Sequence, residues 1–225
     1  MVIVYTSILG GSDNLKPAPT GADRCVCFVD DLEMCNQDAL GWTLHVHPKA
    51  PDPRREAWRL RCVPHQLFDD YQTVVWIDAS FTLTNLPLLL QDSKGHDLSG
   101  LKHHARSSCY EEGREVVRVG QADEGAVSRQ MAAYSRVEFK PRSLTISCVL
   151  VRANNPRVSA FNECWDAEIR ANPGDNTQLS IDYAAWRSGL FVHHLQGVRK
   201  DNPYAVHDHA DHKKRRKPYR TESIA

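Results

Sequence analysis

The most regular feature of the chain is a series of short apolar runs, rich in β-branched residues, that alternate with longer segments of helical spacing. Such runs are typical of buried strands, and their alternation with helices predicts βαβ units and a mainly parallel sheet. The predicted strands are Val2–Thr6, Val26–Asp30, Leu44–His47, Thr73–Ser80, Leu98–Lys102, Ser143–Arg152 and Phe191–Leu195. We expect the Ser143–Arg152 strand to be the core partner of the Thr73–Ser80 strand.

Helical spacing and end signals predict the elements between these strands. An Asn-Pro pair at 155–156 supplies an N-cap and a first-turn proline, and Asn-Pro-Gly at 172–174 ends the same helix. The predicted helical segments are Pro53–Leu67, Asp123–Tyr134, residues 156–171, and a last helix that begins near Asp175-Asn176 and runs through Trp186. We therefore expect a single α/β domain over residues 1–205, followed by a His-rich, basic tail over residues 206–225.

Composition narrows the class of protein. With 225 residues, of which 41% are hydrophobic, the chain can bury one sizeable core. Lys and Arg number 28, as do Asp and Glu, so net charge favours neither nucleic acid nor a membrane surface. The seven cysteines form no Cys-x-x-Cys pair, and we expect reduced, mostly buried thiols in a cytoplasmic protein. No run approaches the ~18 apolar residues of a membrane helix.

Asp78 is the first candidate for function. It ends a buried apolar strand and precedes two small residues, Ala79 and Ser80. Ligands of open α/β sheets bind at the carboxyl ends of strands, so a carboxylate in this position can face a crevice. Asp also commonly caps the turn after a strand, and the segment alone does not separate the two interpretations.

Two later segments carry further candidate chemistry. Gln178 and Asp182 are four residues apart and are expected to share one face near the start of the last helix. His194, Gly197 and Lys200 follow at intervals of three, which suits metal ligation, close backbone approach and phosphate neutralisation. Simple alternatives remain, because Asp182 can be a solvated side chain and a His-rich end can be merely exposed.

Several ordered blocks together resemble one known family. They are Tyr5–Gly11, Arg55–Ser80, His103–Glu112, Cys164–Ile169 and Asn176–Tyr183. The family is a glycosyltransferase-like one, formerly a domain of unknown function, whose plant members act in seed-mucilage and pollen cell-wall synthesis. The resemblance spans nearly the whole chain. It implies a GT-A type, Rossmann-like fold that binds a nucleotide sugar in its amino-terminal half and an acceptor in its carboxyl-terminal half. We expect the acceptor to be a glycan, with a modified nucleic acid as the alternative that the basic tail suits.

The resemblance also implies roles for particular residues. Asp78 and Ser80 take the places of an Asp-x-Asp pair that holds Mn²⁺ or Mg²⁺ on the donor diphosphate, although serine is a poor ligand. His194 would be a second metal ligand and Lys200 a phosphate clamp, as in glycogenin-like transferases, with His209 and His212 as fallback ligands. The remaining expected roles are Arg61 and His65 near the diphosphate, Tyr5, Thr6 and Asp30 at the base and ribose, and Gln178 with Asp182 at the reacting centre, Asp182 as a base.

Two other classes stay open from the residues. The basic run Lys213–Lys217 and the neighbouring histidines would suit a nucleic-acid binding protein or a transferase that acts on a nucleobase. Ser80 would suit a non-catalytic member that binds a sugar nucleotide or a partner. A metal-dependent hydrolase ranks below both, because no Asp-x-Asp or His-x-His pair lies on a recognisable core strand.

Overall fold

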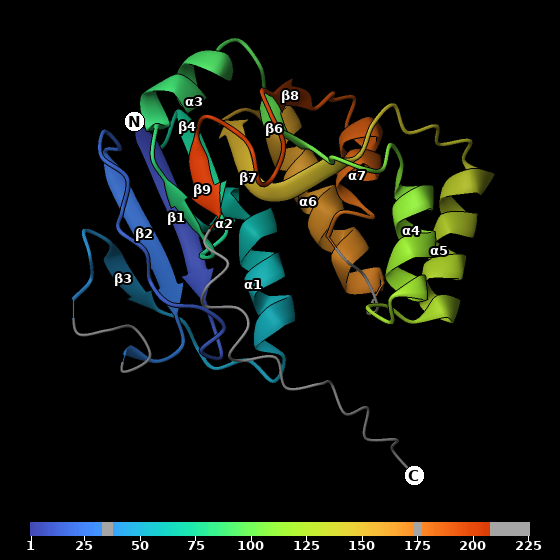
Figure 1. Ribbon diagram of the computed structural model, residues 1–225, viewed down its shortest axis with the longest axis horizontal. Coiled ribbons are helices and arrows are strands. Elements are labelled where there is room, and N and C mark those ends of the chain that lie inside the picture. Colours follow the sequence, from blue (N-terminus) through green and yellow to red (C-terminus); the bar gives the residue numbers. More distant parts are fainter. Residues whose placement is uncertain (33–37, 173–176, 208–225) are drawn as a thin grey trace.

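The computed structural model describes residues 1–32, 38–172 and 177–207. Within these residues the chain forms a three-layer α/β domain (Figure 1). Its strands are β1 (Val2–Ile8), β2 (Arg24–Val29), β3 (Thr43–Val46), β4 (Thr73–Ile77), β5 (Phe81–Leu83), β6 (Leu98–Lys102), β7 (Thr145–Ala153), β8 (His193–Leu195) and β9 (Ala205–His207). Its helices are α1 (Pro53–Cys62), α2 (Pro64–Leu67), α3 (Leu86–Asp92), α4 (Cys109–Arg118), α5 (Glu124–Arg136), α6 (Pro156–Ala171) and α7 (Ile181–Arg187).

The central sheet is mainly parallel and has the strand order β3-β2-β1-β4-β7-β6-β8 in the described residues. Strands β1 to β4 are parallel, β6 is parallel to β8, and β7 runs antiparallel to both of its neighbours. The chain moves from β1 outward to β3 and then returns to place β4 on the other side of β1. The switch point of the topology therefore lies between β1 and β4, which is where such sheets bind ligands.

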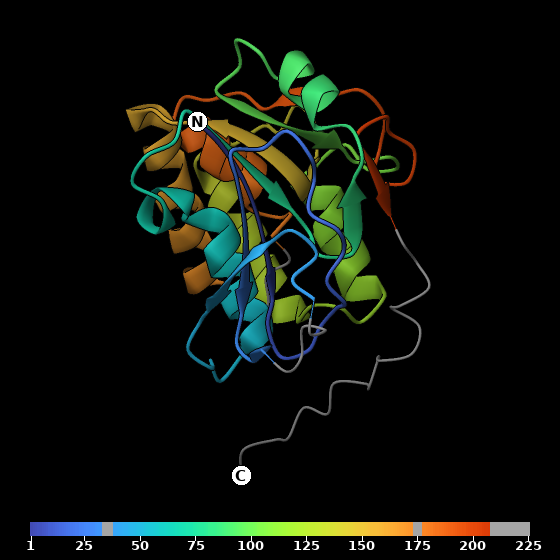
Figure 2. The ribbon, with the colours of Figure 1, turned by 90° about the vertical axis from the view of Figure 1, so that its left-hand side faces the viewer.

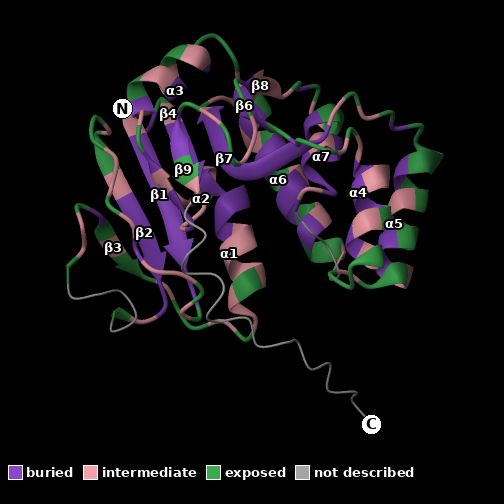
Figure 3. Ribbon diagram, viewed as in Figure 1, coloured by how far each residue is buried: buried purple, intermediate pink, exposed green. Residues whose placement is uncertain are grey.

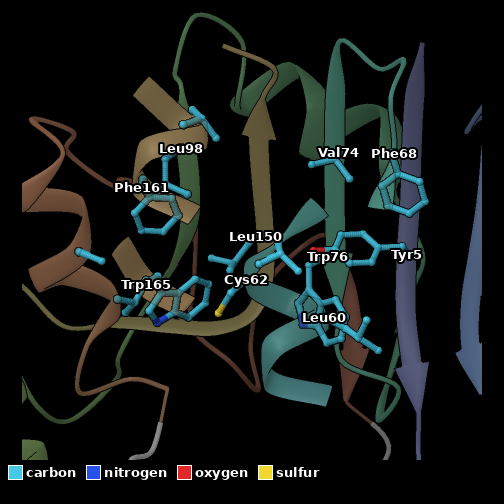
Figure 4. Close-up of a cluster of buried hydrophobic side chains, with 14 of the residues drawn as sticks. Tyr5, Leu60, Cys62, Phe68, Val74, Trp76, Leu98, Leu150, Phe161 and Trp165 are labelled. Atoms are coloured by element: carbon cyan, nitrogen blue, oxygen red, sulfur yellow. The ribbon is translucent and has the colours of Figure 1, made fainter. Parts of the chain in front are cut away.

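One face of the sheet packs against α1, α2, α6 and α7. Figure 4 shows the centre of this cluster, where Tyr5 and Trp76 from the sheet meet Leu60 of α1 and Trp165 of α6. Arg152 is fully buried in the same layer and donates from Nη2 to the Tyr5 hydroxyl (2.5 Å). Burial of these rings fixes the helices on the sheet, because each large aromatic side chain removes about 150–250 Å² from water.

The opposite face packs against α3 and a small second sheet. There β5 and β9 pair antiparallel, and Leu83, Leu86 and Leu89 join the apolar side chains of β1, β4 and β7. The helical pair α4–α5 lies at the far end of the molecule from β3, beside α7 (Figures 1 and 2). Colouring by burial shows the sheet interior to be buried, with exposed positions on the outer sides of the helices (Figure 3).

The fold class predicted from the sequence is confirmed: a Rossmann-like α/β domain with β7 beside β4. Some details differ. Pro64 divides the expected helix over 53–67 into α1 and α2, because its ring cannot continue the hydrogen-bond ladder of the first helix. The last helix begins at Ile181, after a turn over 177–180, so Gln178 lies before the helix and does not share a face with Asp182. Asp175 and Asn176 lie outside the described residues.

Candidate active site

The carboxyl ends of β1 and β4 meet the amino-terminal end of β7 at the switch point. The pairing of β6 with β7 is irregular here, since Gly100 lies opposite Leu150 and Leu101 lies opposite Ile146. Cys148 and Val149 are neighbours yet both pack into the same apolar cluster, so the alternation of side chains is broken. This bulge turns Ser147 and Thr145 towards the helices, and bulges often re-aim side chains next to active sites.

Asp78 is held by two donors at the end of β4. Its Oδ1 accepts from Arg61 Nη2 (2.7 Å) and from the indole Nε1 of Trp76 (2.8 Å). The Asp78 side chain is 26% exposed and that of Arg61 is 10% exposed, so the ion pair is largely sheltered from water. The turn that follows is closed by Phe81 N, which donates to the Asp78 carbonyl (2.9 Å).

Arg61 reaches this pair from the last turn of α1. Helical side chains lean towards the amino terminus of their helix, which for α1 means towards the carboxyl edge of the sheet. Its Nη1 donates to Ser147 Oγ (2.6 Å) and Thr177 Oγ1 (3.1 Å), and its guanidinium carbon lies 4.9 Å from the Trp76 ring centroid. Arg61 therefore positions Asp78 and links it to Ser147, at the start of β7 where the bulge lies.

Asp182 is held by Thr145, which lies two residues before Ser147 on β7. Its Oδ2 accepts from the backbone N–H of Thr145 (2.8 Å), and its Oδ1 accepts from the Thr145 hydroxyl (2.6 Å). Burial raises the pKa of Asp182 to about 6, although both hydrogen bonds from Thr145 act to lower that pKa. A carboxylate with a pKa near the working pH suits a general base, because it is ionised yet retains affinity for a proton.

His194 completes this group from β8. Its Nε2 lies 3.2 Å from Thr145 Oγ1 and 3.4 Å from Ser143 Oγ. The single hydroxyl proton of Thr145 is committed to Asp182, so the Nε2 of His194 must carry the proton that it donates to Thr145. Burial, together with the positive charge of Lys102, lowers the pKa of His194. The imidazole is therefore a neutral donor that orients Thr145, and only its Nδ1 remains for a cation.

A pocket of about 630 Å³ opens beside Asp182 and His194. Cationic and aromatic side chains line its walls: Lys102, Lys140, Arg142, Trp186 and Phe191. Trp186 and Phe191 are 41% and 67% exposed, and Arg142 stacks on the Phe191 ring at 4.6 Å. Exposed aromatic faces beside a half-buried carboxylate are the composition of a binding pocket rather than of a bare surface.

A second polar group follows β6. His103 Nδ1 accepts from the backbone N–H groups of Ala105 (3.1 Å) and Arg106 (2.9 Å), and Arg106 also forms an ion pair with the buried carboxylate of Glu112. Burial, Arg106, His104 and Arg199 together lower the pKa of His103 to about 4. Sequence reasoning noted this segment only as part of the resemblance and assigned its residues no role.

The residues expected at the base and ribose are placed differently from one another. Tyr5 is buried in the core, and its hydroxyl donates to the Arg61 carbonyl (2.8 Å), so it supports Arg61 from within. Asp30 follows β2 at the carboxyl edge of the sheet. Its Oδ2 accepts from Gly10 N (2.8 Å), while its Oδ1 is buried without a partner in the described residues. Thr6 Oγ1 is likewise buried without a partner there.

The other expected residues fall into three groups. Ser80 is buried in the turn after Asp78, whereas Lys200 is exposed on a turn after β8. His65 lies on α2, with Nε2 3.7 Å from Glu163 of α6, and no hydrogen bond in the described residues joins it to Asp78. His209 and His212 lie outside the described residues.

The donor set around Asp78 fits a divalent ion only in part. Among the described residues there is no group of three His, Cys, Asp or Glu side chains that could enclose a metal. Asp78 Oδ2 has no hydrogen-bond partner there, because Oδ1 takes both donors, and the side chain is 26% exposed. One carboxylate oxygen suits Mg²⁺ or Mn²⁺ that arrives on a diphosphate, since Mg²⁺ often binds through one carboxylate and substrate phosphates.

The fold and this crevice define a Rossmann-like α/β domain with a carboxylate at the topological switch point. A model of the TOD1/MUCI70, glycosyltransferase-like domain matches residues 1–195. The chain belongs to this glycosyltransferase-like family, as its sequence blocks predicted. A search of curated proteins found no match. None of the helices in the described residues is both long enough and apolar enough to cross a membrane.

Proposed function

We propose that the protein is a glycosyltransferase that moves a sugar from a nucleotide-sugar donor to an acceptor hydroxyl. The observation that carries this proposal is the presence of two carboxylates at one strand end: Asp78 is joined to Ser147 through Arg61, and Asp182 accepts from Thr145. Membership of a glycosyltransferase-like family supports the same chemistry. Asp78 would stand at the donor diphosphate and Asp182 at the acceptor.

The donor half of the site has to bind a diphosphate and release it. The nucleoside would lie across β1 and β2, near Asp30, and the diphosphate would meet the crevice after β4. Asp78 is held rigidly by Arg61 and Trp76, so its free oxygen is already oriented before donor arrives. A divalent cation held by Asp78 and the diphosphate would neutralise charge on the leaving group.

The acceptor half has to supply a nucleophile. An acceptor hydroxyl in the pocket would lose its proton to Asp182 while its oxygen bonds to the anomeric carbon. The bond from that carbon to the diphosphate oxygen breaks, and its electron pair leaves with the nucleoside diphosphate. The Thr145 hydroxyl and the neutral His194 hold Asp182 in place during the transfer. Trp186 and Phe191 would pack against an acceptor sugar.

Donor screening tests this proposal. Purified protein is incubated with a panel of nucleotide sugars in Mn²⁺, Mg²⁺ or chelator, and both thermal stabilisation and released nucleoside diphosphate are measured. We expect one donor to stabilise the fold and to be cleaved faster when an acceptor glycan is present. Stabilisation by a donor without turnover under any condition would instead support the non-catalytic binder that Ser80 suggests.

A further inference from the structure

Three arginines lie near the carboxyl edge formed by β4, β6 and β8, and they differ in how their charge is balanced. Arg61 is paired with Asp78, and Arg106 is paired with Glu112. Arg199 has no carboxylate partner among the residues that the structure describes. A half-buried guanidinium without a counter-ion is costly unless an anion completes the site, and in the described part of the chain Arg199 is an unbalanced positive charge close to Asp78.

A tight turn presents Arg199. Val198 and Asp201 exchange backbone hydrogen bonds (2.8 and 3.1 Å), which leaves Arg199 and Lys200 as the two central residues. Gly197 has a φ of +85°, and a Cβ there would lie 2.3 Å from the Asp201 carbonyl oxygen, so only glycine fits. Asn202 Nδ2 donates to the Val198 carbonyl (3.1 Å) and holds the turn from the other side.

The Arg199 side chain runs from this turn towards the segment after Asp78. Its guanidinium carbon lies 6.0 Å from the centroid of the Phe81 ring, and its Nη2 lies 3.3 Å from His207 Nε2. Its Nε is buried without a partner in the described residues. Phe81 itself closes the turn onto the Asp78 carbonyl, so Arg199 and Asp78 flank the same four-residue turn.

Electrostatics place Arg199 close to Cys148, on which Asp78 and Arg61 also act. The pKa of the Cys148 thiol is raised to about 12 by burial and by Asp78, while Arg199 and Arg61 act to lower it. The backbone N–H of Asp78 donates to the Cys148 carbonyl (2.9 Å), so Cys148 lies directly next to Asp78. Lys200, by contrast, is exposed, and no hydrogen bond or ion pair within the described residues directs it inward.

We propose that Arg199, and not Lys200, is the cation that binds the diphosphate of the nucleotide ligand. This inference rests on the proposed function for the identity of the ligand and deepens it by naming the residue that receives the phosphate charge. The planar guanidinium offers parallel N–H donors that match two phosphate oxygens. Phe81 and His207 hold its plane, so the fork is oriented before ligand binds.

The test compares two neighbours that carry the same charge. Affinity for UDP, GDP and inorganic pyrophosphate is measured by calorimetry for wild type, Arg199→Gln, Arg199→Lys and Lys200→Gln, each with Mg²⁺ and with chelator. We expect Arg199→Gln to weaken the diphosphate that binds best at least tenfold, Arg199→Lys to recover part of the loss, and Lys200→Gln to stay within twofold of wild type. Unchanged thermal midpoints show that each variant is folded.

The outcomes separate this inference from the proposed function. If Lys200→Gln loses affinity and Arg199→Gln does not, the assignment to Arg199 is wrong while a transferase remains. If Arg199→Gln alone loses affinity but no donor is ever cleaved, the phosphate site stands and the transferase fails. Absence of diphosphate binding by the wild-type protein with and without Mg²⁺ would overturn both.

Discussion

Thr145 and Ser147 lie two positions apart on β7 and face the same helices, one bonded to Asp182 and the other to Arg61. Their separation along the strand is about 7 Å, the rise of two extended residues. One end of β7 therefore sets the distance between Asp78, in the proposed donor half, and Asp182, in the proposed acceptor half. The bulge that turns both side chains to one face is what makes this arrangement available.

Replacing Asp78 by Ala and by Asn separates the effect of its charge from its role as a hydrogen-bond acceptor. Asp78→Ala leaves the Arg61 guanidinium sheltered and unpaired, and we expect a loss of about 3 kcal/mol in the free energy of unfolding. Asp78→Asn keeps an oxygen for Arg61 and Trp76, so its loss should be clearly smaller. Chemical denaturation measures both. Glu115→Ala, which breaks the exposed pair with Arg118, is the control and should be close to neutral. Equal stability of the two Asp78 variants would contradict the assignment of the ion pair.

Thr145→Val tests the control of Asp182 by its neighbour. The Thr145 hydroxyl lowers the pKa of Asp182, so its removal should raise that pKa above about 6. Because a base must be ionised, the acidic limb of the pH–rate profile should move to higher pH. Thr177→Val, which contacts Arg61 but not Asp182, should leave the position of the limb unchanged. A limb that moves equally in both variants would argue against Asp182 as the titrating group.

Asp182 also predicts a pH dependence of stability. Its pKa is raised in the folded protein from 3.8 to about 6, so its contribution to stability is fully present below pH 3.8 and is lost as the pH rises through about 6. Asp182→Asn can keep both bonds to Thr145 without the charge. We expect this variant to be more stable than wild type at pH 8, by up to about 3 kcal/mol, and less so at pH 4. Thermal unfolding of both proteins at pH 8 and pH 4 measures this difference. A wild-type protein more stable than Asp182→Asn at pH 8 would contradict the claim that the charge of Asp182 destabilises the fold.

The aromatic wall of the pocket makes a prediction about acceptor binding. Phe191 is 67% exposed, so Phe191→Ala should barely change stability but should raise the KM for acceptor severalfold. The KM for donor should stay constant, because Phe191 lines the pocket beside Asp182, which we assign to the acceptor. Val119→Ala, at another exposed apolar position, is the matched control. An altered donor KM with a normal acceptor KM would place the acceptor elsewhere.

The fold could be predicted because its signals are local. Apolar runs mark β1, β2, β4 and β7, and Asn155 with Pro156 marks the start of α6. The short strands β5 and β9 escaped prediction, since each has only three residues and depends on the other for its hydrogen bonds. Helix α4 also escaped, although Ser108 caps it with a bond to Glu111 N (3.2 Å).

The site could be predicted only in part, because its contacts join residues that are far apart in the sequence. Asp78 follows from one strand, but its partner Arg61 comes from another element. Asp182 was a candidate because of its distance from Gln178, whereas the structure holds it through Thr145, 37 residues away. Spacing singled out Lys200 as a phosphate ligand, whereas the proposal for Arg199 depends on tertiary contacts with Phe81 and His207, which spacing does not show. The roles of these residues stay predictions.

The most direct test of the account measures donor affinity and sugar transfer separately in two variants. With the donor found by screening, Asp182→Asn should bind with wild-type affinity while transfer falls at least a hundredfold, as expected for loss of a general base. Asp78→Asn should lose donor affinity. Transfer at the wild-type rate by Asp182→Asn would contradict the account, because no proton acceptor would then be needed at that position.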